Sequence, residues 1–112
     1  MQSPEFIARY ALPAVLESLA DNPVVLVQGP RQCGKSTVAM EIARSAGYSY
    51  FTLDDASLLA SAVADPTSFI SDLPLYTVID EVQRAPQVFT AIKSAVDRDS
   101  RPGRFLLTGS SN

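Results

Sequence analysis

The chain has 112 residues, of which 46% are hydrophobic and 19% are charged, and its net charge is −3. This length suits one domain with a real core, and the composition is typical of a globular protein, not of a disordered one. The acidic balance, without any basic run, argues against a nucleic-acid-binding surface. One cysteine and no histidine exclude a disulfide framework and a zinc site.

Residues 1–23 are expected to form a separate helical segment before the main domain. Ser3 is a candidate N-cap, and the helix that it opens is expected to break at Pro13. Two interpretations of this segment stay open. Either Arg9 or Tyr10 contacts a bound ligand, or the helix only packs on the edge of a sheet.

The strongest motif follows this segment. An apolar strand over residues 24–27 leads into the sequence GPRQCGKS and then into a helical pattern. This is a GxxxxGK[ST] loop between a strand and a helix, the setting in which the motif indicates phosphate binding. The backbone N–H groups of such a loop converge on an anion at the positive end of the helix dipole. The nucleotide-binding residues expected from the motif are Gly29, Pro30, Arg31, Gln32, Cys33, Gly34, Lys35, Ser36 and Thr37.

Individual side chains of the loop have separate expected roles. Lys35 would contact the β and γ phosphates as a point charge, the Ser36 hydroxyl would bind Mg²⁺, and Thr37 would lie near the α phosphate. Cys33 has two interpretations. It is either a thiol with a lowered pKa that ATP protects from modification, or a side chain that only fills space in the loop.

The helix behind the loop is expected to end at Gly47, and a second strand is expected over residues 48–53. Asp54 and Asp55 come directly after this strand, at the side of a parallel sheet where ligands gather. These carboxylates either cap the next helix, over residues 56–64, or shape the surroundings of a metal ion.

A short helix opened by Asp65 precedes a third apolar strand, over residues 75–79, which runs into Asp80 and Glu81. Because side chains alternate between the faces of a strand, these two carboxylates are expected to point in opposite directions and to divide two roles. Asp80 would hold the Mg²⁺ ion that Ser36 also contacts. Glu81 would orient the water that attacks the γ phosphate.

The last part of the chain predicts a helix over residues 87–97, with Phe89 among its inward-facing apolar residues. A turn over residues 99–103 follows. A fourth strand over residues 104–108 then runs into the polar stretch 109–112.

Three segments of the chain, GPRQCGKS, YTVIDEVQRAP and FLLTGSSN, resemble in their order and spacing the nucleotide-binding core of prokaryotic AAA+ type P-loop ATPases. The resemblance covers residues 9–112. It implies an α/β, three-layer P-loop NTPase fold with a mainly parallel sheet, in which residues 24–112 form a partial ATPase core. It also implies the roles given above for the lysine and serine of the loop and for the acidic pair.

The same resemblance implies the position of the fourth strand, between the strand of the phosphate loop and the strand of the acidic pair. This order would put residues 108–110 beside the terminal phosphate. Ser110 is then similar to the sensor that reads the γ phosphate, and it joins Lys35 and Glu81 as a catalytic residue. Proteins of this group also have a fifth strand, a helical lid and an arginine that completes a neighbour's site, which these 112 residues do not include. Residues 24–28 are therefore expected to form an apolar sheet edge that favours self-association.

The sequence favours an ATPase domain that binds Mg-ATP, hydrolyses it slowly or not at all, and acts as a motor or switch for a further C-terminal region. Under the first interpretation of residues 1–23, Arg9 or Tyr10 would contact the adenine base of this nucleotide. An alternative is a nucleotide-gated protein-interaction module with little hydrolysis, and a P-loop kinase is a third hypothesis. A GTPase is disfavoured because no guanine-selecting NKxD stretch is present. No apolar run reaches the length of a membrane span and no signal peptide is recognisable, so a cytoplasmic location is expected.

Overall fold

The chain alternates helices and strands, as the sequence indicated. The structure is a computed structural model that describes residues 4–30 and 34–110, with side chains from Ala11 onward within these ranges. Its elements are α1 (Pro4–Asp21), β1 (Val24–Gly29), α2 (Lys35–Ala46), β2 (Ser49–Thr52), α3 (Ala56–Ala64), α4 (Pro66–Ser71), β3 (Thr77–Asp80), the 3₁₀ helix η1 (Val82–Arg84), α5 (Val88–Arg98) and β4 (Phe105–Ser110).

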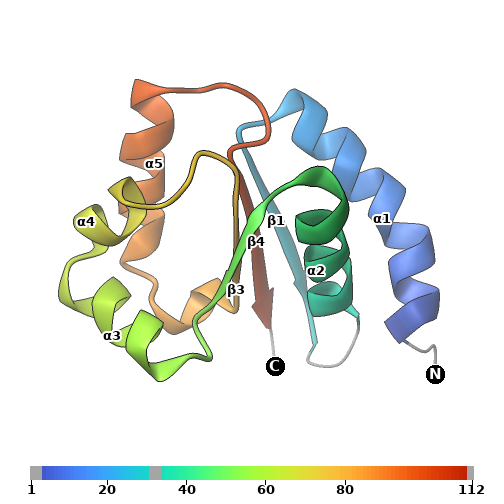
Figure 1. Ribbon diagram of the computed structural model, residues 1–112, viewed down its shortest axis with the longest axis horizontal. Coiled ribbons are helices and arrows are strands. Elements are labelled where there is room, and N and C mark those ends of the chain that lie inside the picture. Colours follow the sequence, from blue (N-terminus) through green and yellow to red (C-terminus); the bar gives the residue numbers. More distant parts are fainter. Residues whose placement is uncertain (1–3, 31–33, 111–112) are drawn as a thin grey trace.

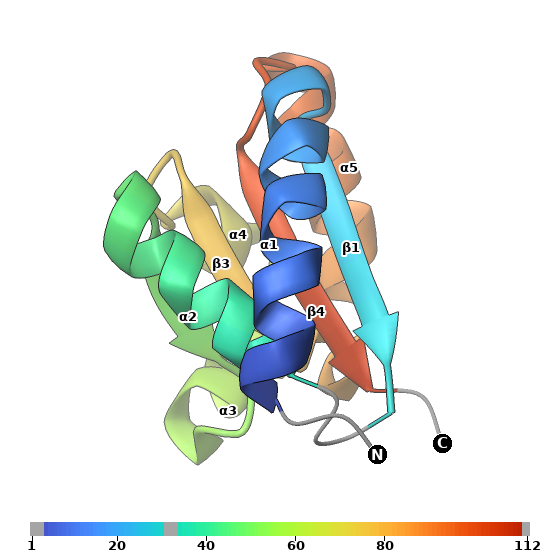
Figure 2. The ribbon, with the colours of Figure 1, turned by 90° about the vertical axis from the view of Figure 1, so that its right-hand side faces the viewer.

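Four strands of the described residues form one parallel sheet in the order β1-β4-β3-β2. The last strand of the chain, β4, therefore lies between β1 and β3, as the resemblance implied. Because the strands are parallel, their carboxyl ends share one edge of the sheet. Figure 2 shows the ends of β1 and β4 at this edge, together with the start of α2. The predicted α/β fold of the P-loop NTPase type is confirmed.

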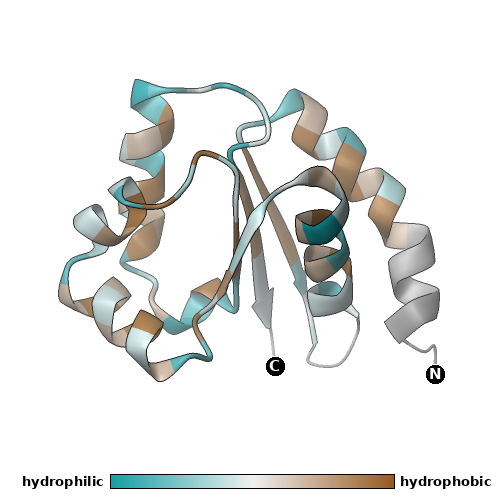
Figure 3. Cartoon of the chain, viewed as in Figure 1, coloured by the Kyte–Doolittle hydropathy of each residue, from teal (hydrophilic) through white to brown (hydrophobic). Residues whose placement is uncertain are grey.

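Helices cover both faces of the sheet (Figure 1), with α1 and α2 on one face and α3, α4 and α5 on the other. Strand residues alternate between these two layers. On β3, Val78 packs with α2 and Ile79 packs on the opposite face, and Leu106 and Leu107 of β4 do the same. Figure 3 shows hydrophobic residues along β1 and β4, between the helical layers. A side chain within one of these strands thus has a predictable face.

The helix α1 continues through Pro13, so the predicted interruption is wrong. Proline removes one N–H donor from a helix, which leaves the carbonyl four residues earlier without its usual partner. The Pro13 side chain is exposed, so its ring lies on the solvent side of the helix. Val15 and Leu19, in the following turns, are buried in the same cluster as residues of α2. Packing on one side and solvent on the other let the helix tolerate the proline.

The ends of two helices agree with the sequence prediction. Gly47 ends α2 with a φ of +79°, a left-handed conformation that favours glycine. Asp55 caps α3, because its carboxylate accepts the N–H groups of Ser57 and Leu58 at 2.9 and 3.1 Å. The capping interpretation of Asp55 is confirmed.

The prediction that Phe89 faces inward is wrong, since this side chain is 40% exposed. A helix turns by about 100° per residue, so a residue next to a buried position easily lies beside the apolar stripe. The stripe of α5 that packs on the sheet consists of Val88, Ala91, Ile92 and Ala95.

The strand β1 lies at one end of the sheet, as the resemblance implied, and pairs with β4. Its residue Leu26 is 42% exposed. In the described part of the chain, no helix is long and apolar enough to cross a membrane.

Candidate functional site

The predicted site residues meet at the carboxyl-end edge of the sheet. Lys35 and Ser36 begin α2, Asp80 ends β3, and Ser110 ends β4. These residues are far apart in the sequence. The parallel sheet brings them together because β3 and β4 are neighbours and α2 packs over their common face.

The start of α2 lies beside Asp80 and Glu81. Gly34 precedes the helix with a φ of +96°, which a residue with a side chain would adopt only with strain. The first hydrogen bond at this end joins the Val38 N–H to the Gly34 carbonyl at 3.0 Å, so the N–H groups of residues 35–37 precede the regular helical pattern. No acidic residue lies in the first turn to neutralise the positive end of the helix dipole. This end of α2 is suited to an anion.

The two predicted metal ligands are in direct contact. The Ser36 hydroxyl donates to Asp80, with its Oγ 3.0 and 3.2 Å from the two carboxylate oxygens. Asp80 faces α2 because it follows Val78 by two positions on the same strand. A hydroxyl and a carboxylate are oxygen ligands of the kind that Mg²⁺ prefers, so these residues fit the ion.

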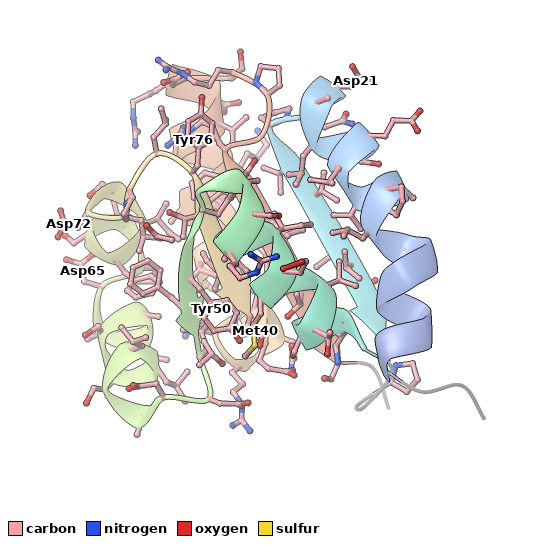
Figure 4. All side chains as sticks on the ribbon, turned by 45° about the vertical axis from the view of Figure 1, so that its right-hand side comes forward. Asp21, Met40, Tyr50, Asp65, Asp72 and Tyr76 are labelled. Atoms are coloured by element: carbon pink, nitrogen blue, oxygen red, sulfur yellow. The ribbon has the colours of Figure 1, made fainter. Side chains whose placement is uncertain are left out.

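Two further hydroxyls donate to Asp80. They belong to Tyr50 of β2 and Thr108 of β4, the strands on either side of β3. Burial raises the pKa of Tyr50 above its ordinary value, and the hydrogen bond to Asp80 raises it further, so this phenol remains a proton donor. Figure 4 shows Tyr50 between β2 and α2. The carboxylate of Asp80 is thus fixed from three sides.

The backbone of Glu81 leaves the strand in a left-handed conformation, with φ 59° and ψ 47°, the one such non-glycine residue in the described part of the chain. The alternation of a strand ends before Glu81, so the reason given for Asp80 and Glu81 to point in opposite directions does not apply to this pair. Its carboxylate lies 3.8 Å from the Lys35 ammonium, and both side chains are almost completely buried. Left-handed backbone at a residue with a side chain costs about 1–3 kcal/mol, and such strained positions cluster at functional sites.

The hydroxyl of Ser110 also contacts Glu81, donating to the carboxylate at 2.8 and 3.1 Å. The fourth strand extends beyond its predicted end because Gly109 and Ser110 pair with Gln28 and Gly29 of β1. This extension places Ser110 within reach of the acidic pair. The predicted catalytic residues Lys35, Glu81 and Ser110 are thus brought together.

Sequence reasoning missed two residues of this network, Tyr50 and Gln83. Tyr50 was one of several aromatic residues in an apolar strand, and only the pairing of β2 with β3 shows that it shares a face with Asp80. Gln83 lies between the acidic pair and the helix predicted over residues 87–97, and it donates to Glu81 at 2.8 Å. The local signal that could have found Gln83 is a polar amide two residues after the acidic pair.

The structure also describes three predicted residues that lie outside the network around Asp80 and Glu81, namely Pro30, Thr37 and Asp54. The Lys35 ammonium lies 3.4 Å from the Pro30 carbonyl, and Thr37 is exposed on the first turn of α2. Asp54 forms an ion pair with Arg84 at 2.7 Å. Outside the described residues or side chains are Ser3, Arg9, Tyr10, Arg31, Gln32 and Cys33.

Comparisons with known proteins agree with this geometry. A family model described as an AAA domain matches residues 21–112. Uncharacterized proteins of Mycobacterium bovis and Mycobacterium tuberculosis are each 38% identical to the chain over 104 residues, which is 93% of this chain and 23% of each relative. The chain therefore spans about a quarter of the length of these relatives. The predicted P-loop NTPase-type core is confirmed, and the chain belongs to the AAA domain family.

Proposed function

We propose that this chain binds Mg-ATP and hydrolyses it, and that it serves as a motor or switch for other parts of a longer cytoplasmic protein. The observation that carries the proposal is the contact of the Ser36 hydroxyl with Asp80, at 3.0 Å, beside the buried pair of Lys35 and Glu81. Membership of the AAA domain family supports nucleotide binding. The relatives are uncharacterized, so the hydrolytic step rests on the chemistry of the site.

The triphosphate would bind at the start of α2. Gly29, Gly34 and the N–H groups of residues 35–37 would surround the phosphates, with Lys35 contacting the β and γ groups. To do so, the Lys35 ammonium would leave its contacts with the Pro30 carbonyl and the Glu81 carboxylate. Binding of the nucleotide would therefore change the surroundings of Glu81.

Asp80 and Ser36 would hold the Mg²⁺ ion. The ion, when bound, neutralises charge on the β and γ phosphates as the bond between them breaks. Tyr50 and Thr108, which donate to Asp80, would keep its carboxylate oriented toward Ser36.

Glu81 would accept a hydrogen bond from the attacking water and take its proton. The water oxygen would form a bond to the γ phosphorus while the bond from that phosphorus to the bridging oxygen breaks, which releases ADP and inorganic phosphate. Ser110, through its hydroxyl contact with Glu81, would report the presence of the γ phosphate. In other P-loop nucleotide hydrolases, an arginine supplied by a partner raises the rate of hydrolysis about 10³- to 10⁵-fold. We therefore expect slow hydrolysis from this chain alone.

The test is a lysine substitution with a matched control. Lys35→Ala should abolish Mg-ATP binding measured by calorimetry, whereas Lys93→Ala, at a side chain that is 79% exposed on α5, should bind as the wild type does. Because Lys35 is buried against Glu81, its loss can destabilise the fold, so a thermal melt must show that each variant is folded. If Lys35→Ala is unfolded, Lys35→Met replaces it in the test, because methionine retains the apolar stem of the lysine. Unchanged affinity in a folded Lys35 variant would refute the proposal.

One observation also favours a second function, a nucleotide-gated interaction module. Glu81 accepts hydrogen bonds from Ser110 and Gln83 and pairs with Lys35, so nucleotide binding can rearrange a whole network without any hydrolysis. A partner of such a module must bind with different affinity in the presence and absence of Mg-ATP. Equal affinities would exclude this function.

A further inference from the structure

The side chain of Gln83 connects two residues to which the proposed function gives roles. Its amide Nε2 donates to Glu81 Oε1 at 2.8 Å, and its Oε1 accepts the backbone N–H of Ser110 at 3.1 Å. Ser110 in turn donates its hydroxyl to Glu81. Gln83, Glu81 and Ser110 therefore form a closed triangle of hydrogen bonds between η1 and the end of β4.

The backbone explains how Gln83 reaches this position. The left-handed turn at Glu81 ends β3 and starts η1, so the chain curls back within two residues. The N–H of Glu81 donates to Thr108 at 2.9 Å, which attaches this turn to β4. A Cβ added at Gly109 would lie 3.4 Å from the Gln83 Oε1, so the amide is packed closely against the β4 backbone.

The chemistry of the triangle requires an amide. A primary amide presents a donor and an acceptor in one rigid plane, and both are used here. A carboxylate at position 83 could accept the hydrogen bond from the Ser110 N–H, but its charge would repel the Glu81 carboxylate. An apolar side chain could neither accept from Ser110 nor donate to Glu81. Such a loss would leave the buried Glu81 with one donor fewer.

We propose that Gln83 is a positioning residue that holds Glu81 against the end of β4, so that Ser110 and Glu81 respond together to the γ phosphate. This inference rests on the proposed function. When the phosphates attract Lys35, Glu81 loses its ion pair, and the hydrogen bonds from Gln83 and Ser110 then keep its carboxylate in the site. Gln83 itself touches neither nucleotide nor water in this role.

The experiment compares Gln83→Met and Gln83→Glu with Gln87→Met. Gln87 is exposed at the start of α5 and makes no side-chain capping bond, so it is a matched control. Each protein is tested for Mg-ATP affinity by calorimetry and for hydrolysis in single turnover, with the chain in excess so that slow rates are measurable. Both Gln83 variants should keep the affinity of the wild type and lose about 10- to 100-fold in rate, by analogy with residues that orient the ligands of a metal ion. The control should match the wild type in both.

A second measurement does not need hydrolysis. The side-chain amide resonances of Gln83 are assigned in the NMR spectrum of the nucleotide-free chain, because they are absent from the spectrum of Gln83→Met. They should move in Ser110→Ala, whereas the resonances of the Gln87 amide should stay in place.

The outcomes separate the two proposals. Three results would overturn the role of Gln83 and leave the proposed function standing. They are wild-type rates in folded Gln83 variants, Gln83 amide resonances that stay in place in Ser110→Ala, and a loss of affinity for Mg-ATP in proportion to the loss of rate. A wild-type chain that neither binds nor hydrolyses Mg-ATP would overturn the proposed function, and the role of Gln83 with it.

Discussion

The Ser36 hydroxyl lies 3.0 Å from a carboxylate oxygen of Asp80, although 44 positions separate these residues in the chain. One residue belongs to the first turn of a helix and the other to the last position of a strand. They meet because α2 packs on the face of β3 that Asp80 shares with Val78. A hydroxyl and a carboxylate are oxygen groups of the kind that Mg²⁺ prefers as ligands, so this contact is the basis of the proposed metal site.

Substitution of Asp80 should therefore remove the metal dependence of nucleotide binding. Asp80→Asn keeps the size of the side chain but removes the charge, and we expect it to lower the affinity for ATP in the presence of Mg²⁺ on the order of tenfold, or about 1.4 kcal/mol. Without Mg²⁺ the variant and the wild type should bind ATP similarly. Calorimetry with and without a chelator measures both affinities, with the exposed Asp72→Asn as a control. An undiminished effect of Mg²⁺ in Asp80→Asn would remove Asp80 from the metal site.

Substitution of Glu81 should separate binding from hydrolysis. Glu81→Gln retains the shape of the side chain but cannot take a proton from water, so we expect Mg-ATP to bind while the single-turnover rate falls about 10²- to 10⁴-fold. Glu17→Gln, at an exposed position of α1, is the control. If Glu81→Gln hydrolyses ATP as fast as the wild type, Glu81 is not the base.

The local features of this chain were readable from its sequence because short-range chemistry determines them. The end of α2 depends on Gly47, which adopts the left-handed conformation that favours glycine. Asp55 was one of two candidate caps, and the cap was foreseeable because the acceptor and the N–H groups that it bonds lie within three residues. The position of β4 came from the resemblance to a family, since periodicity alone does not order parallel strands.

The acidic pair shows where such reasoning stops. Alternation was applied to Glu81 as if β3 continued, but the strand ends at Asp80 and the next residue is left-handed. The position at which a strand ends depends on its neighbours, here on the bond between the Glu81 N–H and Thr108. The roles of Tyr50 and Gln83 depend on the same long-range pairing. The sequence alone does not show which strands pair, so it could not predict these two roles.

Removal of the α3 cap should destabilise the fold by a small, defined amount. Asp55→Ala takes away the acceptor of the Ser57 and Leu58 N–H groups, and such losses typically cost about 1 kcal/mol. Asp55→Asn should retain most of the stability because asparagine is also a good cap. The free energy of unfolding in urea measures both variants. Equal losses in the two variants would show that the charge of Asp55, and not its capping bonds, stabilises α3.

The side of β1 that faces away from β4 is an edge of the sheet. Within residues 4–30 and 34–110, β1 has β4 as its one strand neighbour, and a groove of about 360 Å³ runs beside it. The groove is mostly apolar and is lined by Val24, Leu26, Phe89, Ile92, Lys93, Val96, Asp97 and Leu107. A sheet edge presents unpaired N–H and C=O groups, and an apolar groove next to it adds a hydrophobic contribution to pairing with another chain.

We therefore expect this chain to self-associate through β1 when no further strand covers it, and a lysine on the edge should prevent this. Leu26→Lys places a charge at the apolar edge and should shift the sedimentation coefficient at high protein concentration toward that of a monomer. Leu16→Lys, on α1, introduces the same charge at a leucine of similar exposure, 39% against 42% for Leu26, and should leave the association of the wild type unchanged. If both variants dissociate equally, added net charge is the cause, and β1 is not the contact. A wild-type chain that sediments as a monomer at every concentration contradicts the prediction directly.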